Sequence, residues 1–275
     1  MKRVMENAAE IADKRFGQNF LKESYYIGQI IQAIPNNGLP IVEIGPGLGD
    51  LTKELVRVGN VTAYEVDKRL CEYLKEAFSK EILSGKLTLV CDDVMDAWRG
   101  GDLGIGEYNL VANLPYYIAT NLVVKGLKDE KCRSILTMVQ REVARKFTAT
   151  SGEKEFSSLS VLARSCGDAN LLFEVPPEAF TPPPKVTSAV MLLKKSSSLR
   201  DGKFEAFLKV AFKQPRKKLL KNLSSLYDSE RLKKLFSDMK LDSDLRPHQA
   251  ETSVYHRLYN ELTKDDTDGE QQKSG

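Results

Sequence analysis

The sequence predicts an α/β fold in which a doubly wound, mostly parallel sheet is followed by a small C-terminal helical domain. Between Pro40 and Leu193, short β-branched or apolar runs alternate with longer helical patterns. This alternation is typical of βαβ units with helices on both faces of one sheet. After Leu193 the sequence changes to a polar linker, 194–203, and then to helical patterning from Phe204 to about Leu262. In such a fold, the ligand site is expected at the carboxyl ends of the strands.

The predicted strands are short runs of β-branched and apolar residues, which suit a sheet buried on both faces. The predicted helices between them are longer and carry apolar residues at helical spacing. In chain order the strands are 41–44, 61–64, 87–90, 109–112, 134–139 and 189–193, and the helices include 50–58, 68–83 and 120–127.

These patterns divide the chain into three parts. Residues 1–195 are expected to form the sheet domain, and residues 203–262 the helical domain. The charged, Gly-containing stretch 263–275 is expected to be a disordered tail, because it lacks the apolar residues that a packed core requires.

Composition narrows the class of protein. With 275 residues and 41% hydrophobic content, the chain can form a sizeable core and a smaller second unit. No apolar run approaches the roughly 18 residues needed to cross a bilayer, and the first residues mix both charge signs. We therefore expect a soluble, cytoplasmic and monomeric protein with no membrane partner. The cysteines stand far apart, which argues against a zinc knuckle or a disulfide framework and favours reduced, mostly buried thiols. They are Cys71, Cys91, Cys132 and Cys166.

Basic residues are unevenly distributed, although Lys plus Arg number only 41 against 38 Asp plus Glu. The stretch 206–227 has no acidic residue, and Pro215 is expected to split it into two helices, the second starting at or just after the proline. Such a surface can meet a phosphate backbone, but it is also compatible with an ordinary solvated helix surface. The candidate RNA-binding residues are Lys14, Arg15, Arg141, Arg145, Lys213, Arg216, Lys217, Lys218 and Lys221.

Three features at successive strand ends indicate an adenosine-containing cofactor. The loop Gly45-Pro46-Gly47-Leu48-Gly49 follows a strand and precedes a helix, so its backbone can approach a bound cofactor. It is not the dinucleotide fingerprint, whose last glycine follows two intervening residues. Glu65 ends the next strand, where a carboxylate can accept bonds from two ribose hydroxyls. After the third strand, Asp92 or Asp93 can receive the adenine amino group. Each feature alone could be an ordinary turn glycine or a solvent-exposed acidic residue, but this explanation poorly accounts for all three features occurring in this order.

The run Asn113-Leu114-Pro115-Tyr116 indicates methyl transfer to an amino nitrogen. An exocyclic amino group is a poor nucleophile because its lone pair is delocalised into the ring. An Asn side-chain oxygen and a backbone carbonyl can accept its two N–H bonds and direct the lone pair toward a methyl donor, while the tyrosine offers a face for a flipped-out base. The proline fixes φ and so helps to aim the carbonyls and the ring. The same tetrapeptide is also an ordinary ending of a strand.

Together these residues resemble the rRNA adenine N6-dimethyltransferases, over about residues 12 to 260. The segment 14–21, Lys-Arg-Phe-Gly-Gln-Asn-Phe-Leu, is similar to the N-terminal motif of that family, and 43–49 is similar to its glycine loop. The segment 180–186, Phe-Thr-Pro-Pro-Pro-Lys-Val, looks like its late motif. Asp92 departs from the small or neutral residue that is common in the family.

The resemblance implies a Rossmann-like class I methyltransferase that uses S-adenosylmethionine. Its expected substrate is a pair of adjacent adenosines in the 3′-terminal hairpin of small-subunit (16S) rRNA. The rRNA is either naked or part of a pre-subunit particle, and the enzyme is expected to have a role in small-subunit biogenesis. It places Asn19 and Leu21 on the cofactor, and Phe180 opposite Tyr116 around the target adenine. The full set of expected cofactor-binding residues is Asn19, Leu21, Gly45, Gly47, Glu65, Asp93 and Asn113.

The expected reaction is an in-line displacement that needs neither a metal nor a general base, because the methylated nitrogen is acidic enough to lose a proton to water. His248 and His256 are interpreted as surface or packing residues. Two alternatives remain: a large-subunit rRNA adenine dimethyltransferase that confers macrolide resistance, and a non-catalytic ribosome-assembly factor. A DNA amino-methyltransferase is disfavoured, because nothing in the sequence resembles a target-recognition domain.

Overall fold

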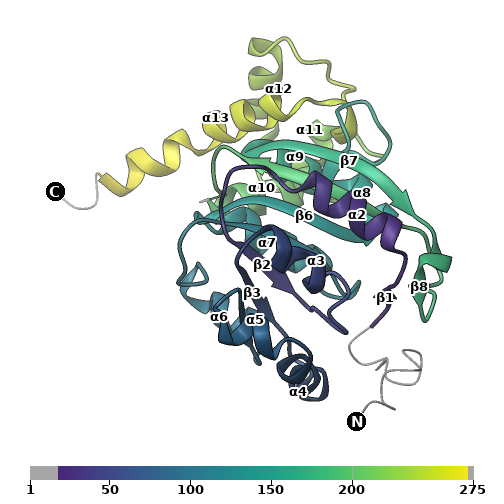
Figure 1. Cartoon of the computed structure of the whole chain (residues 1–275). Coiled ribbons are helices and arrows are strands. Elements are labelled where there is room, and N and C mark those ends of the chain that lie inside the picture. Colours follow the sequence, from purple (N-terminus) through teal and green to yellow (C-terminus); the bar gives the residue numbers. More distant parts are fainter. Residues whose placement is uncertain (1–17, 200, 272–275) are drawn as a thin grey trace. The chain divides into compact units, whose positions relative to one another are not determined.

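The computed structural model describes residues 18–199 and 201–271 of the chain. The described residues form two compact units, which we treat separately. Of the described residues, 18–144 and 166–198 belong to the first unit, and 145–165, 199 and 201–271 to the second. Figure 1 labels the elements of both units.

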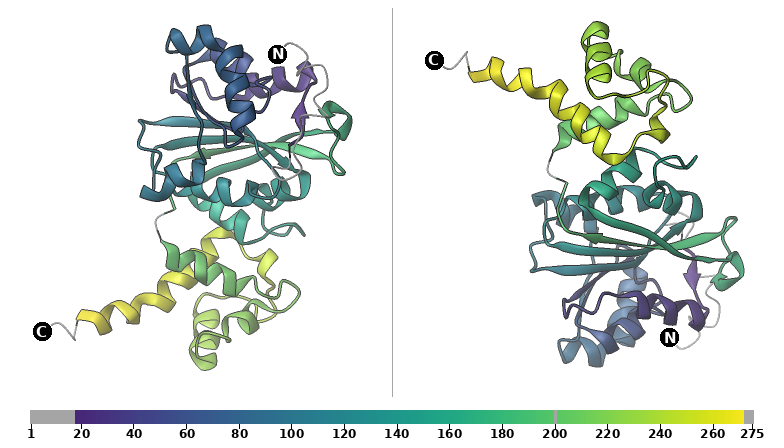
Figure 2. Two further views of the ribbon diagram at one scale, coloured as in Figure 1. Left: turned by 90° about the horizontal axis from the view of Figure 1, so that it is seen from below. Right: turned by 90° about the horizontal axis from the view of Figure 1, so that it is seen from above.

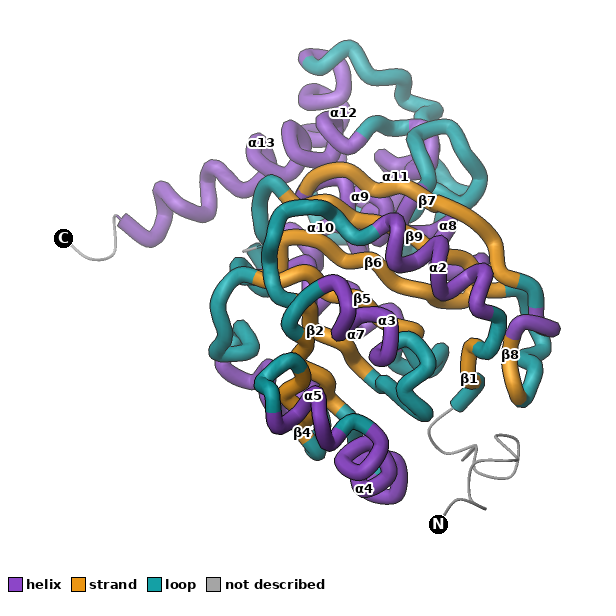
Figure 3. Tube along the Cα trace, in the orientation of Figure 1, coloured by secondary structure: helices purple, strands orange, loops and turns teal. Residues whose placement is uncertain are grey.

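The first unit is built on a seven-stranded sheet with the order β4-β3-β2-β5-β6-β9-β7 (Figure 3). The first five of these strands are parallel, β9 is antiparallel to β6, and β7 is antiparallel to β9. The strands are β2 (Ile41–Ile44), β3 (Val61–Tyr64), β4 (Leu87–Val90), β5 (Tyr108–Asn113), β6 (Cys132–Gln140), β7 (Gly167–Val175) and β9 (Ser188–Lys195).

The predicted doubly wound, mostly parallel sheet is confirmed. All six predicted strands lie within observed strands of the sheet. Strand β7 was not predicted, and neither was the short ladder between β1 (Phe20–Leu21) and β8 (Phe180–Thr181). Strand β7 is antiparallel to its neighbour at one edge of the sheet, and β1 lies near the N-terminus. The alternation of strands and helices that predicts parallel strands is absent from both places.

Helices cover both faces of the sheet (Figure 2). Asp67 caps the N-terminus of α4 (Lys68–Ala77), because its side chain accepts a hydrogen bond from the backbone N–H of Arg69. Asp93 caps α6 (Val94–Ala97) in the same way, through the N–H of Met95. Such caps satisfy N–H groups that have no partner inside a helix. The helices are α2 (Ser24–Ala33), α3 (Thr52–Val58), α4 (Lys68–Ala77), α5 (Ser79–Leu83), α6 (Val94–Ala97) and α7 (Ala119–Lys128), with 3-10 turns η3 (Trp98–Gly100) and η4 (Pro177–Ala179).

The second unit is helical. Its helices are α9 (Ser158–Cys166), whose last residue belongs to the first unit, α10 (Gly202–Ala211), α11 (Leu219–Leu223), α12 (Ser229–Asp238) and α13 (Thr252–Gln271), with a 3-10 turn η5 (Pro247–Gln249). Helix α8 (Arg141–Thr148) starts in the first unit and ends in the second.

The boundaries of the two units differ from the sequence-based division, because residues 145–165 join the helical unit. The reason is aromatic packing between distant parts of the chain. The ring of Phe156 lies 6.2 Å from that of Phe212, which stacks on Tyr255 at 5.2 Å. Helix α13 continues to Gln271, within the segment expected to be disordered, and α11 begins four residues after Pro215 rather than beside it.

The expectation that all cysteines are reduced is wrong for one pair. Cys71 and Cys91 form a disulfide, with their Cα atoms 5.9 Å apart. They are 20 residues apart in sequence, and the pairing arises because α4 and the end of β4 are neighbours in the fold. Cys132 and Cys166 are free and buried, as expected. Among the residues that the structure describes, no helix is long and apolar enough to span a membrane.

Candidate active site

A cleft opens at the carboxyl ends of the parallel strands of the first unit. It spans about 1260 Å³ of space, including open solvent at its mouth. The cleft brings together every residue expected to bind the cofactor, and four of the five expected to act on the target. The first group is Asn19, Leu21, Gly45, Gly47, Glu65, Asp93 and Asn113, and the second adds Leu114, Pro115 and Tyr116 to Asn113.

The glycine loop needs its glycines for two reasons. Gly45, Gly47 and Gly49 have φ values of +69°, +61° and +82°, where side chains are strained. A Cβ atom on Gly47 would also lie 3.0 Å from the ring of Phe20, and one on Gly49 would collide with the ring of Phe78. A side chain at any of these positions would therefore strain the backbone or crowd the loop. The N–H groups of the three glycines are bonded inside the protein, Gly45 to the carbonyl of Tyr64, Gly47 to the carboxylate of Glu65 and Gly49 to the carbonyl of Pro46.

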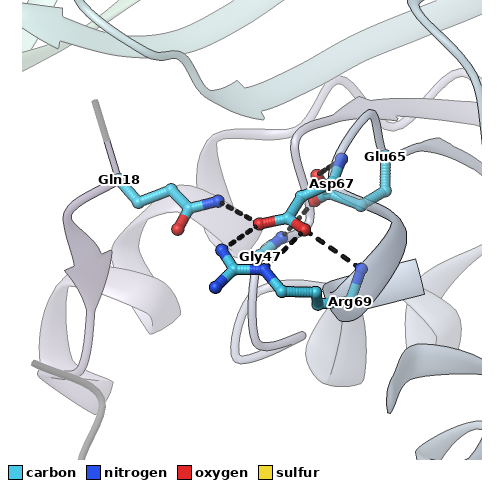
Figure 4. Close-up of polar contacts among 5 residues, drawn as sticks. All are labelled: Gln18, Gly47, Glu65, Asp67 and Arg69. Carbon is cyan, nitrogen blue, oxygen red and sulfur yellow. Dashed lines mark hydrogen bonds and ion pairs between the residues drawn. The ribbon is translucent and has the colours of Figure 1, made fainter. Parts of the chain in front are cut away.

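Glu65 is held by backbone donors. Its Oε2 accepts from the N–H of Gly47 at 3.1 Å and its Oε1 from the N–H of Asp67 at 2.9 Å, as Figure 4 shows. The residue is only 3% exposed. Burial raises the pKa of Glu65, and the two backbone hydrogen bonds act against that shift. Each carboxylate oxygen retains acceptor capacity, so both ribose hydroxyls can bind here.

Asp93 lines the cleft and Asp92 does not. Asp93 caps α6 by accepting from the N–H of Met95 at 2.8 Å, which fixes its carboxylate. Asp92 is exposed, and its Oδ1 accepts from the N–H of Asp93. This arrangement supports Asp93 as the acceptor for the adenine amino group.

A further buried carboxyl, Glu43 of β2, also lines the cleft. Glu43 is 1% exposed, and its Oε2 accepts from the hydroxyl of Thr52 at 2.7 Å. Burial raises the pKa of Glu43 to about 8, against the effect of the Thr52 hydrogen bond and with a smaller contribution from Glu65. Near neutral pH this carboxyl is therefore mainly protonated.

Asn113, the last residue of β5, has a fixed amide orientation. Its Nδ2 donates to the backbone carbonyl of Asn19 at 3.0 Å. A carbonyl can only accept, so the amide nitrogen must face Asn19, and Oδ1 is left to accept bonds on the other side. The next residue, Leu114, donates its N–H to the carbonyl of Met138 at 3.1 Å. The amide and the following peptide are therefore both anchored to the sheet.

The two aromatic residues differ in their surroundings. Tyr116 lines the cleft, and its hydroxyl is 2.7 Å from the hydroxyl of Ser188, which is fully buried on β9. Burial raises the pKa of Tyr116, so the phenol is neutral. Phe180, by contrast, is 3% exposed, packs in the core and does not line the cleft. The structure thus brings Tyr116, but not Phe180, to the expected target site.

The family model for ribosomal RNA adenine dimethylase matches residues 10–264. This chain belongs to the ribosomal RNA adenine dimethylase family. A relative from Sulfurimonas denitrificans, named ribosomal RNA small subunit methyltransferase A, is 53% identical, with 90% of this chain and 93% of the relative covered. A relative of the same name from Helicobacter hepaticus is 46% identical, with 94% of each chain covered.

The fold of the family is seen in solved structures. The structure of ErmE, a 23S rRNA methyltransferase, superposes with a TM-score of 0.69 at 25% identity and covers 90% of this chain and all of that one. A dimethyladenosine transferase from Plasmodium falciparum gives a TM-score of 0.72 at 21% identity, over 89% of this chain and 98% of that one. Both support a class I methyltransferase sheet followed by C-terminal helices.

Enzymes of this family depend on S-adenosylmethionine, and the cleft fits that cofactor. The carboxylate of Glu65, which has spare acceptor capacity, matches a ribose, and the carboxylate of Asp93 matches an adenine. The glycine loop lines the same cleft and, without side chains at its glycines, lets a bound group approach its backbone. In the described residues, no cluster of three or more His, Cys, Asp or Glu side chains is placed to hold a metal ion.

Three residues of the site or its support were missed by sequence reasoning. Gln18 and Asp67 are joined by a hydrogen bond of 3.2 Å, and Ser188 holds Tyr116. The sequence could have indicated Asp67 only as a helix-capping residue. It could have indicated Gln18 only because Gln18 is next to Asn19, which was expected to bind the cofactor. Nothing in the sequence marks Ser188.

The expected RNA-binding residues fall into three groups. Lys14 and Arg15 lie outside the described residues. Arg141 and Arg145 lie on α8, where Arg141 pairs with Glu174 at 3.3 Å. The others are exposed on the loop before α11 or on that helix, and Lys218 pairs with Asp244. They are Lys213, Arg216, Lys217, Lys218 and Lys221.

Proposed function

We propose that this protein uses S-adenosylmethionine to dimethylate N6 of two adjacent adenosines in the 3′-terminal hairpin of 16S rRNA. The observation that carries the proposal is the fixed amide of Asn113, whose Nδ2 is committed to the carbonyl of Asn19 at the cofactor cleft. The names of the relatives from Sulfurimonas denitrificans and Helicobacter hepaticus support the small subunit as the target.

The residues of the chain act on the target amine by positioning it. The Oδ1 of Asn113 and the carbonyl of Leu114 accept the two amine hydrogens, which turns the nitrogen lone pair out of the ring plane. Pro115 lacks an N–H and fixes the turn, and the ring of Tyr116 supports the base. S-adenosylmethionine, when bound, supplies an electrophilic methyl group.

No side chain is required as a general base. After transfer, the nitrogen is cationic and gives its proton to water. The second methyl transfer uses the same acceptors, with one hydrogen left on the amine. The histidine His256 is occupied elsewhere, since it stacks on Phe204 at 4.6 Å and bonds to Ser165 in the helical unit.

The RNA is held mainly through its phosphates and shape. Lys14, Arg15, Arg141 and Arg145, together with the exposed basic residues between Lys213 and Lys221, supply the positive charge for this contact. The protein acts in the cytoplasm as a monomer on small-subunit rRNA or on a pre-subunit particle, and its binding also serves subunit assembly. Phe180 joins the target site only after a movement of β8, because its ring is buried in the present arrangement.

The test is to supply labelled S-adenosylmethionine with under-methylated small subunits, large subunits or DNA, and to identify the methylated nucleoside. Dimethyladenosine in the small subunit alone is the expected result. Label in the large subunit would favour the resistance enzyme, and label nowhere would leave only a binding role. Asn113→Ala should reduce transfer by on the order of a hundredfold or more while weakening cofactor binding only modestly. Unchanged turnover would reject the assignment of Asn113.

A further inference from the structure

The short segment Gln18–Leu21 borders the cleft and is bonded to both the cofactor side and the target side of the site. All of its residues line the cleft. Because it is connected to two functional regions, a change at one end of the segment is transmitted to the other through four consecutive residues. We call this segment the clasp.

The cofactor end of the clasp is Gln18. Its Nε2 donates to Oδ2 of Asp67 at 3.2 Å, and the same carboxylate receives the guanidinium of Arg69 at 2.7 and 3.1 Å. Figure 4 shows the Asp67 carboxylate between these two donors. The N–H of Asp67 in turn donates to Glu65, the carboxylate expected to bind the ribose. Gln18 is thus two hydrogen bonds away from the cofactor-binding carboxylate.

The target end of the clasp consists of Asn19 and Leu21. The carbonyl of Asn19 accepts from the amide of Asn113, and Leu21 pairs with Phe180 in the β1–β8 ladder. Immediately after the clasp, the N–H of Lys22 donates to the carbonyl of Ala179 at 2.9 Å. The clasp therefore fixes one residue that holds the target amine and the strand that carries Phe180.

We propose that Gln18 and Asp67 form a latch that holds the clasp in place, and that through the clasp this latch sets both cofactor affinity and the orientation of the Asn113 amide. Asp67 and Gln18 are positioning residues in this proposal, because they act through Glu65 and Asn19. The role given to Asn113 rests on the proposed function, whereas the latch itself does not.

The chemistry of the latch favours a measurable effect. Asp67 is only 4% exposed, so its carboxylate depends on protein donors rather than on water. A hydrogen bond to a charged acceptor is stronger than a neutral one. Arg69 alone leaves part of this acceptor capacity unused, and Gln18 is the donor that links it to the clasp. Loss of the glutamine amide removes this hydrogen bond between the start of the clasp and the ribose side of the cleft.

The first measurement is calorimetric binding of S-adenosylhomocysteine to the full chain, without RNA. For Gln18→Ala we expect the Kd to rise about tenfold, as loss of one hydrogen bond to a charged group implies. The matched control is Gln29→Ala on α2, which removes another glutamine whose Nε2 has a side-chain partner, the Tyr25 hydroxyl at 3.1 Å, but which does not line the cleft. Its Kd should stay within about twofold of the parent.

A double-mutant cycle separates the latch from other effects of Gln18. Asp67→Ser keeps an oxygen that can cap α4, but its side chain is too short to reach Gln18. If the two residues act as one latch, Gln18→Ala should change the Kd by less than about twofold in the Asp67→Ser background. An undiminished tenfold effect there would overturn the latch, and so would a Gln18→Ala Kd equal to that of the parent.

The second measurement is the ¹⁵N resonance of the Asn113 side-chain amide, assigned as the signal that Asn113→Ala removes. We expect Gln18→Ala to shift or broaden this signal and Gln29→Ala to leave it unchanged. A raised Kd with an unaltered Asn113 signal would refute the link to the target side. Neither readout uses RNA, so failure of the parent protein to methylate 16S rRNA would reject the proposed function without bearing on the latch.

Discussion

The hydrogen bond between Tyr116 and Ser188 allows the role of the tyrosine ring to be separated from the role of its hydroxyl. The two hydroxyl oxygens are 2.7 Å apart, and Ser188 is fully buried at the start of β9, where it pairs with Gln140 of β6 and Val175 of β7. A neutral buried hydrogen bond contributes about 1 kcal/mol, and slightly more when its loss leaves a partner unsatisfied. Each of Tyr116→Phe and Ser188→Ala should therefore reduce kcat/KM for the RNA about 5- to 10-fold.

The double variant should be no worse than either single variant, because both remove the same bond. Tyr116→Ala should lose more, since base stacking on an aromatic ring contributes about 1–3 kcal/mol in addition. The assay is methyl transfer with limiting RNA and saturating cofactor. Tyr25→Phe, an exposed tyrosine whose hydroxyl accepts from Gln29, is the matched control and should be neutral.

Two results would contradict this reasoning. If the effects of Tyr116→Phe and Ser188→Ala multiply in the double variant, the two hydroxyls act independently. If Tyr116→Ala is no worse than Tyr116→Phe, the ring does not support the base, and the tyrosine has a different role.

Three further predictions concern the surface, the core and pH. Glu substitution of Arg216 and Lys217, which are exposed, should weaken RNA binding and make its salt dependence shallower by roughly 1.5 to 2 in slope; an unaltered slope would reject this surface. Asp129→Ala should lower the free energy of unfolding by about 3–5 kcal/mol in denaturant titrations, because this buried carboxylate accepts from a buried indole and a buried phenol, whereas exposed Asp102→Ala should cost about 0.5 kcal/mol or less. Burial raises the pKa of Glu43 to about 8, so the stability linked to its neutral form is complete below pH 4.5 and is lost as pH rises through about 8; Glu43→Gln should flatten that loss in unfolding measurements.

The parallel strands could be predicted because each is a short run rich in β-branched and apolar residues. All four residues of Ile41–Ile44 are buried, as the sequence of a strand covered on both faces requires. Strand Gly167–Val175 could not be predicted in the same way. It begins with Gly, Asp and Asn residues of low strand propensity, and its burial alternates, so its conformation depends on pairing with β9.

The site residues likewise divide into those that the strand pattern predicts and those that depend on contacts between distant parts of the chain. The glycine loop, Glu65 and Asp93 follow successive strands, and a parallel sheet brings such ends to one edge whatever the intervening sequence. The contact between Gln18 and Asp67 spans 49 residues and no periodicity implies it. The Cys71–Cys91 pair is similar, since only the packing of α4 beside β4 brings the thiols together.

Phe180 shows where a motif and a structure give different information. The motif places this aromatic at the target base, but a ring that is 3% exposed cannot stack on a base without moving. The strand that carries it is two residues long, and within residues 18–199 and 201–271 it pairs only with Phe20–Leu21. Few backbone hydrogen bonds resist its displacement, so exposure of Phe180 costs less than opening a longer ladder would. Because Leu21 belongs to the clasp and pairs with Phe180, we expect movement of Phe180 toward a base to alter the clasp, and we therefore expect binding of a base to be coupled to the cofactor side of the cleft.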